Sequence, residues 1–260
     1  MINISKNELV DKLLDYFVNE DKRFLEYERS NNYNEKRIFL RGIINMRLPY
    51  PLDKEILKME DNLLQLELKD KVISDVNDIF CIENRMALWC GDITTLRIGA
   101  IVNACNEKLL GCFIPNHSCI DNAIHTYAGI RLRLKCNEIM QGRDEETGKA
   151  EITDAFNLPS DYVIHTVGPI VYQKVTNKER KELENCYISC LDLAKENNIR
   201  TIAFPSISTG VFHFPKDEAS EIAVRTVRNY LKKEPMAFDK IIFNVFTEED
   251  MNYYERLFKN

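Results

Sequence analysis

The last two thirds of the chain alternates short apolar runs with longer amphipathic segments, and this alternation narrows the possible folds most. Runs rich in β-branched or aromatic residues predict buried strands at 86–90, 100–102, 162–166, 201–204 and 240–245. Apolar residues at helical spacing predict helices over 121–140, 177–197, 215–232 and 248–258. Such an order is typical of an α/β sandwich around a largely parallel or mixed sheet. Because ligands bind at the carboxyl ends of strands in such folds, the loops after the strands should carry the chemistry.

Residues 1–75 differ in composition from the rest of the chain, since they contain one glycine and neither cysteine nor histidine. Apolar residues recur at helical spacing around 9–17, 38–46 and 56–66, and Pro49 and Pro51 separate the second stretch from the third. We therefore predict a helical N-terminal extension over 1–75, acting as a cap or interaction module, and one α/β domain over 76–260.

Charge and hydropathy exclude several classes of protein. The chain has 35 Lys and Arg against 41 Asp and Glu, and a net charge of −6 argues against electrostatically driven nucleic-acid binding. No apolar run approaches a membrane span, and the first residues lack the basic and then apolar layout of a signal peptide. We expect a cytoplasmic protein, in which the eight cysteines are thiols, core residues or metal ligands rather than disulfides.

Polar residues follow the first two predicted strands. Asp92, in the stretch Gly-Asp-Ile-Thr, either caps the next turn or offers a carboxylate to an exocyclic amine. Asn103 and Asn106 follow the second strand, where they are either turn formers or amides directed toward sugar hydroxyls.

The third loop, 111–121, holds Cys112, His117 and Cys119 within eight residues. Thiolate and imidazole are ligands that suit zinc, and closely spaced ligands converge without closing a long loop. A structural zinc site normally has a fourth protein ligand, whereas three ligands leave a position for water or substrate. The alternatives are core packing and a site completed by a distant cysteine.

The fourth loop, 205–215, lies between a predicted strand and a predicted helix and contains small hydroxyl residues and a glycine. Such a loop offers backbone N–H groups to a phosphate, although it has neither a Walker A ending nor a dinucleotide fingerprint. A tight turn is the alternative. Phe212 in this loop is either a core residue or a stacking surface.

Taken in order, these loops resemble the macrodomain family, the α/β modules that bind ADP-ribose. The matching stretches are 91–94, 101–106, 120–129, 162–169 and 206–212. The chain is more narrowly similar to the zinc-containing macrodomains of microbes, in which the glycine-rich stretch before the Ile-Asp pair is expanded into a Cys, Pro, His, Cys loop. The resemblance implies a three-layer α/β/α sandwich with a mixed sheet, a helical N-terminal extension, and zinc near the distal ribose.

The resemblance also implies a role for individual residues. Asp121 and Asn106 would be catalytic, and Asn103 and Asn106 would lie at the distal ribose. The ligands of one Zn²⁺ per chain would be Cys112, His117 and Cys119. The remaining ADP-ribose contacts would be Asp92 and the Ile93 backbone at the adenine, the backbone amides of Ser208, Thr209, Gly210 and Val211 at the diphosphate, and Phe212 at the distal ribose. His213 departs from the family, which commonly has glycine there.

The function implied is a zinc-dependent protein ADP-ribosylhydrolase that removes mono-ADP-ribose from modified side chains. Its partners would be ADP-ribose and a mono-ADP-ribosylated protein, with a lipoyl-carrier-like protein as one candidate, and neither nucleic acid nor membrane. Two alternatives stay open: a reader that binds ADP-ribose without turnover, and a deacetylase of O-acetyl-ADP-ribose.

Overall fold

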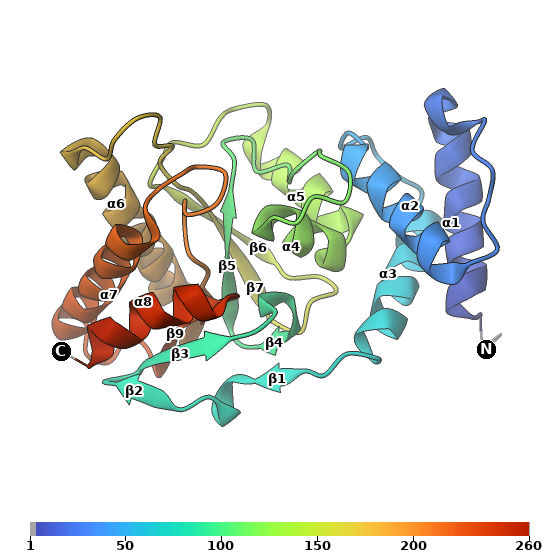
Figure 1. The fold of residues 1–260 in the computed structure, drawn as a ribbon. Helices are drawn as coiled ribbons and strands as arrows, with labels where there is room; N and C mark the ends of the chain where they lie inside the picture. The colour runs from blue at the N-terminus through green and yellow to red at the C-terminus, as the bar shows by residue number, and fades with distance from the viewer. Residues whose placement is uncertain (1–3, 260) are drawn as a thin grey trace.

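The computed structural model describes residues 4–259, in which a seven-stranded sheet lies between two layers of helices (Figure 1). The five inner strands run parallel, and the two edge strands are antiparallel to their neighbours. This confirms the predicted α/β/α sandwich with a mixed sheet. In sheet order the strands are β2 (Cys81–Glu83), β3 (Met86–Cys90), β9 (Lys240–Val245), β8 (Thr201–Phe204), β5 (Ala100–Cys105), β7 (Tyr162–Val167) and β6 (Ala150–Asp154).

Helices cover both faces of the sheet because its central strands are apolar on both sides. Val102 of β5 packs into the core beneath one helical layer, and Ile101 packs into the core beneath the other. The first layer consists of α6 (Asn177–Glu196), α7 (Lys216–Lys233) and α8 (Glu248–Phe258); the second consists of α4 (Ile120–Ala128) and α5 (Ile130–Met140). Within residues 4–259, no helix has the length and apolar character needed to cross a membrane.

Two of the differences from the sequence prediction bear on the site. The predicted helix over 121–140 is two helices, because Gly129 has a φ of 92° that breaks the helical path between α4 and α5. Strand β5 extends three residues beyond 102, so Asn103 lies within the strand. A polar residue is tolerated there because its side chain is hydrogen-bonded inside the protein.

The N-terminal helices form a block with its own core beside α4 and α5 (Figure 1). As predicted, it contains three α-helices: α1 (Lys6–Glu20), α2 (Tyr33–Met46) and α3 (Lys54–Leu68). Ile130 of α5 joins the core of this block, so the two parts share a packed interface. At the end of the predicted extension, β1 (Ser74–Asp75) pairs with β4 (Leu96–Arg97) of the α/β part.

Candidate functional site

The loops that the sequence singled out converge at the carboxyl edge of the parallel strands. Asp92 follows β3, the loop that contains Cys112, His117 and Cys119 follows β5, and Ser208 follows β8. Figure 1 shows the β5–α4 loop in green and the β8–α7 loop in orange at the same end of the sheet. The edge therefore brings together residues that are more than a hundred positions apart in the sequence.

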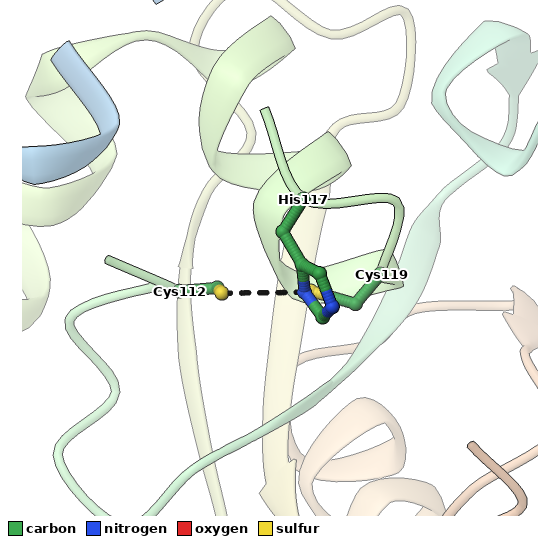
Figure 2. Close-up of side chains that lie close together, drawn as sticks. All are labelled: Cys112, His117 and Cys119. Atoms are coloured by element: carbon green, nitrogen blue, oxygen red, sulfur yellow. Dashed lines mark hydrogen bonds between the residues drawn. The ribbon is translucent and has the colours of Figure 1, made fainter. Parts of the chain in front are cut away.

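Cys112, His117 and Cys119 gather their ligand atoms within 4.8 Å of one another. Cys112 reaches toward the His117 ring from one side, with Cys119 next to the ring (Figure 2), and Cys112 Sγ lies 3.5 Å from His117 Nδ1. Tetrahedral zinc, with bonds of about 2.3 Å to sulfur and 2.0 Å to nitrogen, separates such ligand atoms by about 3.6 Å. The three residues thus fit the ion that the resemblance implies. Among residues 4–259, no fourth histidine, cysteine or carboxylate joins this group.

Cys119 is also the N-cap of α4, and its Sγ accepts a hydrogen bond from the Asn122 backbone N–H at 3.4 Å. A helix N-terminus favours negative charge, which suits a metal-bound thiolate. Without a cation, burial and the neighbouring Cys112 thiol raise the pKa of Cys119 to about 12. The loop therefore places a thiol that a cation would deprotonate at the start of the helix that carries Asp121.

Asp121 lies in the first turn of α4 and is only 5% exposed. Its Oδ1 accepts a hydrogen bond of 2.9 Å from Asn103 Nδ2, and His125 Nε2, one helical turn later, is 3.6 Å from the same oxygen. Burial raises the pKa of Asp121 to about 6, against the Asn103 hydrogen bond and the charge of Arg133. Asn103 and His125 thus set the orientation of the Asp121 carboxyl group, two residues after Cys119.

A chain of buried polar groups continues behind Asp121. Asn103 Nδ2 is also 3.2 Å from His165 Nδ1, and His165 Nε2 is 3.0 Å from Thr153 Oγ1. Burial lowers the pKa of His165 to about 3, so the ring is neutral and carries one proton. The contacts assign that proton to Nε2, which donates to Thr153 and leaves Nδ1 to accept from Asn103. Both amide hydrogens of Asn103 are then used, and one of them is aimed at Asp121.

His125, Cys136 and His165 form a second group whose ligand atoms lie within 4.8 Å, and all three are buried. They come from α4, α5 and β7, so their spacing along the chain gives no sign of the group. Burial and the nearby Arg133 lower the pKa of His125 well below its usual range. Because both ring nitrogens of His165 already have partners, Asn103 and Thr153, this group favours a polar core over a metal site.

Asp92 caps the 3₁₀ turn Ile93–Thr95, because its Oδ1 accepts from the Thr94 backbone N–H at 2.9 Å and from the Thr94 hydroxyl at 2.6 Å. Its other oxygen is 3.7 Å from Lys71 Nζ, and the side chain is 43% exposed. Phe246 directly follows β9, whose end pairs with the end of β3, and its side chain is 78% exposed. The Gly91 N–H donates to Val245 O and fixes the two loops side by side. The sequence prediction missed Phe246 because a single exposed aromatic residue is common.

The β8–α7 loop folds as a tight turn beside open space. Ser208 has a φ of 64°, and its carbonyl accepts from the Phe214 N–H at 3.0 Å. The turn packs closely on Gly168, where a Cβ would lie 2.1 Å from Ser208 Oγ. At Gly210, by contrast, a Cβ would meet nothing within 4 Å, and Val211 is exposed. The loop is therefore compatible with both earlier interpretations, a turn and a phosphate cradle.

Asn106 and Phe212 take part in loop structure. The Asn106 side chain donates to Gly111 O at 3.3 Å and accepts from the Lys108 N–H at 3.1 Å, so it shapes the turn before the metal loop. Phe212 is half-buried, and its carbonyl accepts from the Val171 N–H at 2.8 Å. The catalytic role of Asn106 and the ribose contact of Phe212 stay predictions.

Comparisons with known proteins show the family of the chain. The Macro domain family model matches residues 102–223. The chain is 45% identical over 251 residues to a protein-ADP-ribose hydrolase of Treponema medium, covering 94% of this chain and 96% of the relative. It is 44% identical over 257 residues to a protein-ADP-ribose hydrolase of Staphylococcus aureus strain MRSA252, covering 94% of each. The crystal structure of a Trypanosoma brucei macrodomain in complex with ADP-ribose matches with a TM-score of 0.66 at 27% identity, covering 89% of this chain and 97% of that one. This protein therefore belongs to the Macro domain family.

Proposed function

We propose that this protein is a zinc-dependent hydrolase that removes mono-ADP-ribose from modified protein side chains. The observation that carries the proposal is the pairing of buried Asp121 with the three-ligand group that ends two residues earlier at Cys119. The relatives from Treponema medium and Staphylococcus aureus, named protein-ADP-ribose hydrolases, support this activity. The Trypanosoma brucei macrodomain, solved with ADP-ribose, supports the ligand.

The order of the strands suggests how ADP-ribose would lie along the edge of the sheet. We assign the adenine to Asp92 and the Ile93 backbone beyond β3, with Phe246 as a stacking face. The backbone amides of 208–211, beyond β8, would hold the diphosphate, and Phe212 would contact the distal ribose. From β3 to β5 the sheet takes three strand spacings, about 14 Å. An extended ADP-ribose molecule spans that scale, so its distal ribose would reach the metal loop and Asp121.

The side chains next to the distal ribose would handle the proton and the developing charge. When bound, zinc would supply an open coordination position that polarises a ribose hydroxyl or a water. Asn103 holds Asp121 Oδ1, so we assign Oδ2 to the substrate. As a carboxylate, Oδ2 would accept a proton from the attacking water or stabilise the positive charge that develops on the ribose. Asn106, in the turn that follows β5, would help to place the ribose hydroxyls.

The resemblance makes a mono-ADP-ribosylated lipoyl-carrier-like protein the first substrate to examine. The layout of the first residues favours the cytoplasm, where cysteine ligands stay reduced. Both remain part of the proposal.

A turnover assay separates the hydrolase from its two alternatives. A mono-ADP-ribosylated protein is incubated with the wild-type chain and with Asp121→Asn, and free ADP-ribose is measured; O-acetyl-ADP-ribose serves as a second substrate. We expect release by the wild type and at least a hundredfold slower release by the variant, as for loss of a general base, about 10²–10⁴-fold. Tight ADP-ribose binding without release would identify a reader. Turnover confined to the acetyl ester would identify a deacetylase.

A further inference from the structure

Helix α2 of the N-terminal extension contacts the metal-ligand loop, defined here as residues 112–119. Figure 1 shows α2 beside α4 and the loop that precedes it, and α2 packs against α4. Arg41 and Asn45 make the polar contacts. They are four residues apart and so project from the same face of the helix.

Arg41 binds the loop through a buried asparagine. Its Nη2 donates to Asn122 Oδ1 at 2.7 Å and, more weakly, to His117 O at 3.4 Å. The amide of the fully buried Asn122 in turn donates to Ile114 O at 3.1 Å, and its backbone N–H donates to Cys119 Sγ. One guanidinium therefore holds the residue that ties the middle of the loop to its last ligand.

Asn45 binds the loop backbone directly. Its Oδ1 accepts from the Asn116 N–H at 3.0 Å, while its Nδ2 donates to Thr126 Oγ1 at 3.2 Å. Asn116 has a φ of 54°, a left-handed conformation that needs support from its surroundings. Between the two polar residues, Gly42 lets the helix backbone approach closely, because a Cβ there would lie 3.1 Å from Asn116 Nδ2.

A third attachment comes from Arg133 of α5. Its Nη1 donates to Ile44 O near the end of α2, and its Nε donates to Leu110 O just before the loop, both at 2.7 Å. The guanidinium also lies 4.6 Å from the centre of the Phe113 ring. The start of the loop and the end of α2 are thus both hydrogen-bonded to the buried guanidinium of Arg133.

We propose that α2 is part of the metal site, with Arg41 and Asn45 as positioning residues that hold residues 112–119 in the ligand-binding conformation. The loop has no regular secondary structure, so its three ligands converge only if its backbone is ordered. Ordering the loop backbone costs conformational entropy. Contacts that order the loop before the metal binds remove this cost from binding and therefore raise the affinity for the metal. The inference rests on the zinc site of the proposed function.

The test uses the full chain with Arg41→Met, which removes the guanidinium and its two hydrogen bonds and keeps an unbranched apolar side chain. Zinc affinity is measured by competition with a chromophoric chelator, and hydrogen exchange of residues 112–119 is measured in the metal-free protein. We expect about a tenfold loss of zinc affinity, as for other residues that support metal ligands, and faster exchange in the loop. The matched control is Arg37→Met, one turn earlier on α2, whose guanidinium pairs with Glu67 of α3 at 2.7 and 3.0 Å. This control should keep the affinity and loop exchange of the wild type.

The inference is overturned if Arg41→Met keeps wild-type affinity and exchange, or if both variants change alike. If Arg41→Met does not fold, Asn45→Ala tests the same attachment through Asn116. If the wild type binds no zinc, the metal assignment fails, and the exchange of the loop in the metal-free proteins alone decides whether α2 holds it.

Discussion

Replacing Thr153 by valine tests whether the buried chain behind Asp121 sets the orientation of that carboxylate. Thr153 lies on β6, is buried, and contacts His165 Nε2 through Oγ1 at 3.0 Å. Valine has nearly the same shape, so the substitution removes a hydroxyl without opening a cavity. Either the Nε2–H loses its hydroxyl acceptor and keeps only Cys136 Sγ, a weak acceptor at 3.8 Å, or the proton moves to Nδ1, where it opposes the N–H of Asn103 and frees Asp121.

An unpaired buried N–H costs about 1–3 kcal/mol. At about 2–4 °C per kcal/mol for a chain of this size, a loss of about 2 kcal/mol lowers Tm by about 6 °C. Turnover should suffer more than binding, because most of the proposed ADP-ribose contacts lie elsewhere along the edge. A shift of the reacting group by about 1 Å costs up to about a hundredfold in rate, so we expect kcat to fall at least about tenfold with little change in the Kd of ADP-ribose.

The assay combines kcat for ADP-ribose release, the Kd of ADP-ribose by calorimetry, and thermal unfolding. Thr166→Val is the matched control: Thr166 is fully buried on β7, and its hydroxyl donates to Lys149 O at 2.7 Å, away from Asp121. The control should lose similar stability and keep kcat. A Thr153→Val protein that loses stability but turns over like the wild type would refute the role of the chain, as would equal losses of kcat in both variants.

Three further predictions concern the metal, the adenine end and the extension. Cys119→Ser should lose bound zinc by elemental analysis while calorimetry still detects ADP-ribose binding; a variant that keeps one zinc per chain contradicts the ligand assignment. Asp92→Ala should weaken ADP-ribose binding at least about tenfold, as for a lost charged hydrogen bond of about 1.5–3 kcal/mol, with about 1 kcal/mol of stability lost with the cap; unchanged affinity removes the adenine assignment. Burial raises the pKa of Glu60 from 4.5 to about 7. The folded state therefore binds the Glu60 proton more tightly than the unfolded state does. The contribution of this proton to the free energy of unfolding, about 3 kcal/mol, is fully present below about pH 4.5 and is lost as the pH rises through 7. In urea unfolding, the free energy of unfolding of Glu60→Gln relative to the wild type should be higher at pH 8 than at pH 5. A difference between the two proteins that does not change with pH would contradict this.

Local patterns in the sequence predicted the parts of the site whose residues lie close together in the chain. Cys112, His117 and Cys119 converge because they share one short loop, and parallel strands carry that loop and residues 208–212 to one edge. The cap at Asp92 was also foreseen, because Asp before a turn is a local signal.

Contacts between distant segments had no such signal. Arg41 and Asn122 are 81 positions apart, and Asn103 and His165 are 62 apart, so neither pairing follows from spacing. Asn103 was expected in a loop, since polar residues seldom occupy a central strand, yet its buried partners keep it in β5. The edge strand β6 was missed because polar residues, among them the buried Thr153, alternate with Ala150 and Ile152 and break the apolar run.

The most direct test of the proposed function is turnover by one preparation before and after metal removal. The purified chain is stripped by a chelator, shown by circular dichroism to stay folded, and then reloaded with one equivalent of zinc. ADP-ribose release from a mono-ADP-ribosylated protein is measured at each stage. We expect release to be lost in the folded metal-free protein and to return with zinc, while ADP-ribose binding partly survives throughout. Full turnover by the folded, metal-free protein would contradict the proposed zinc dependence.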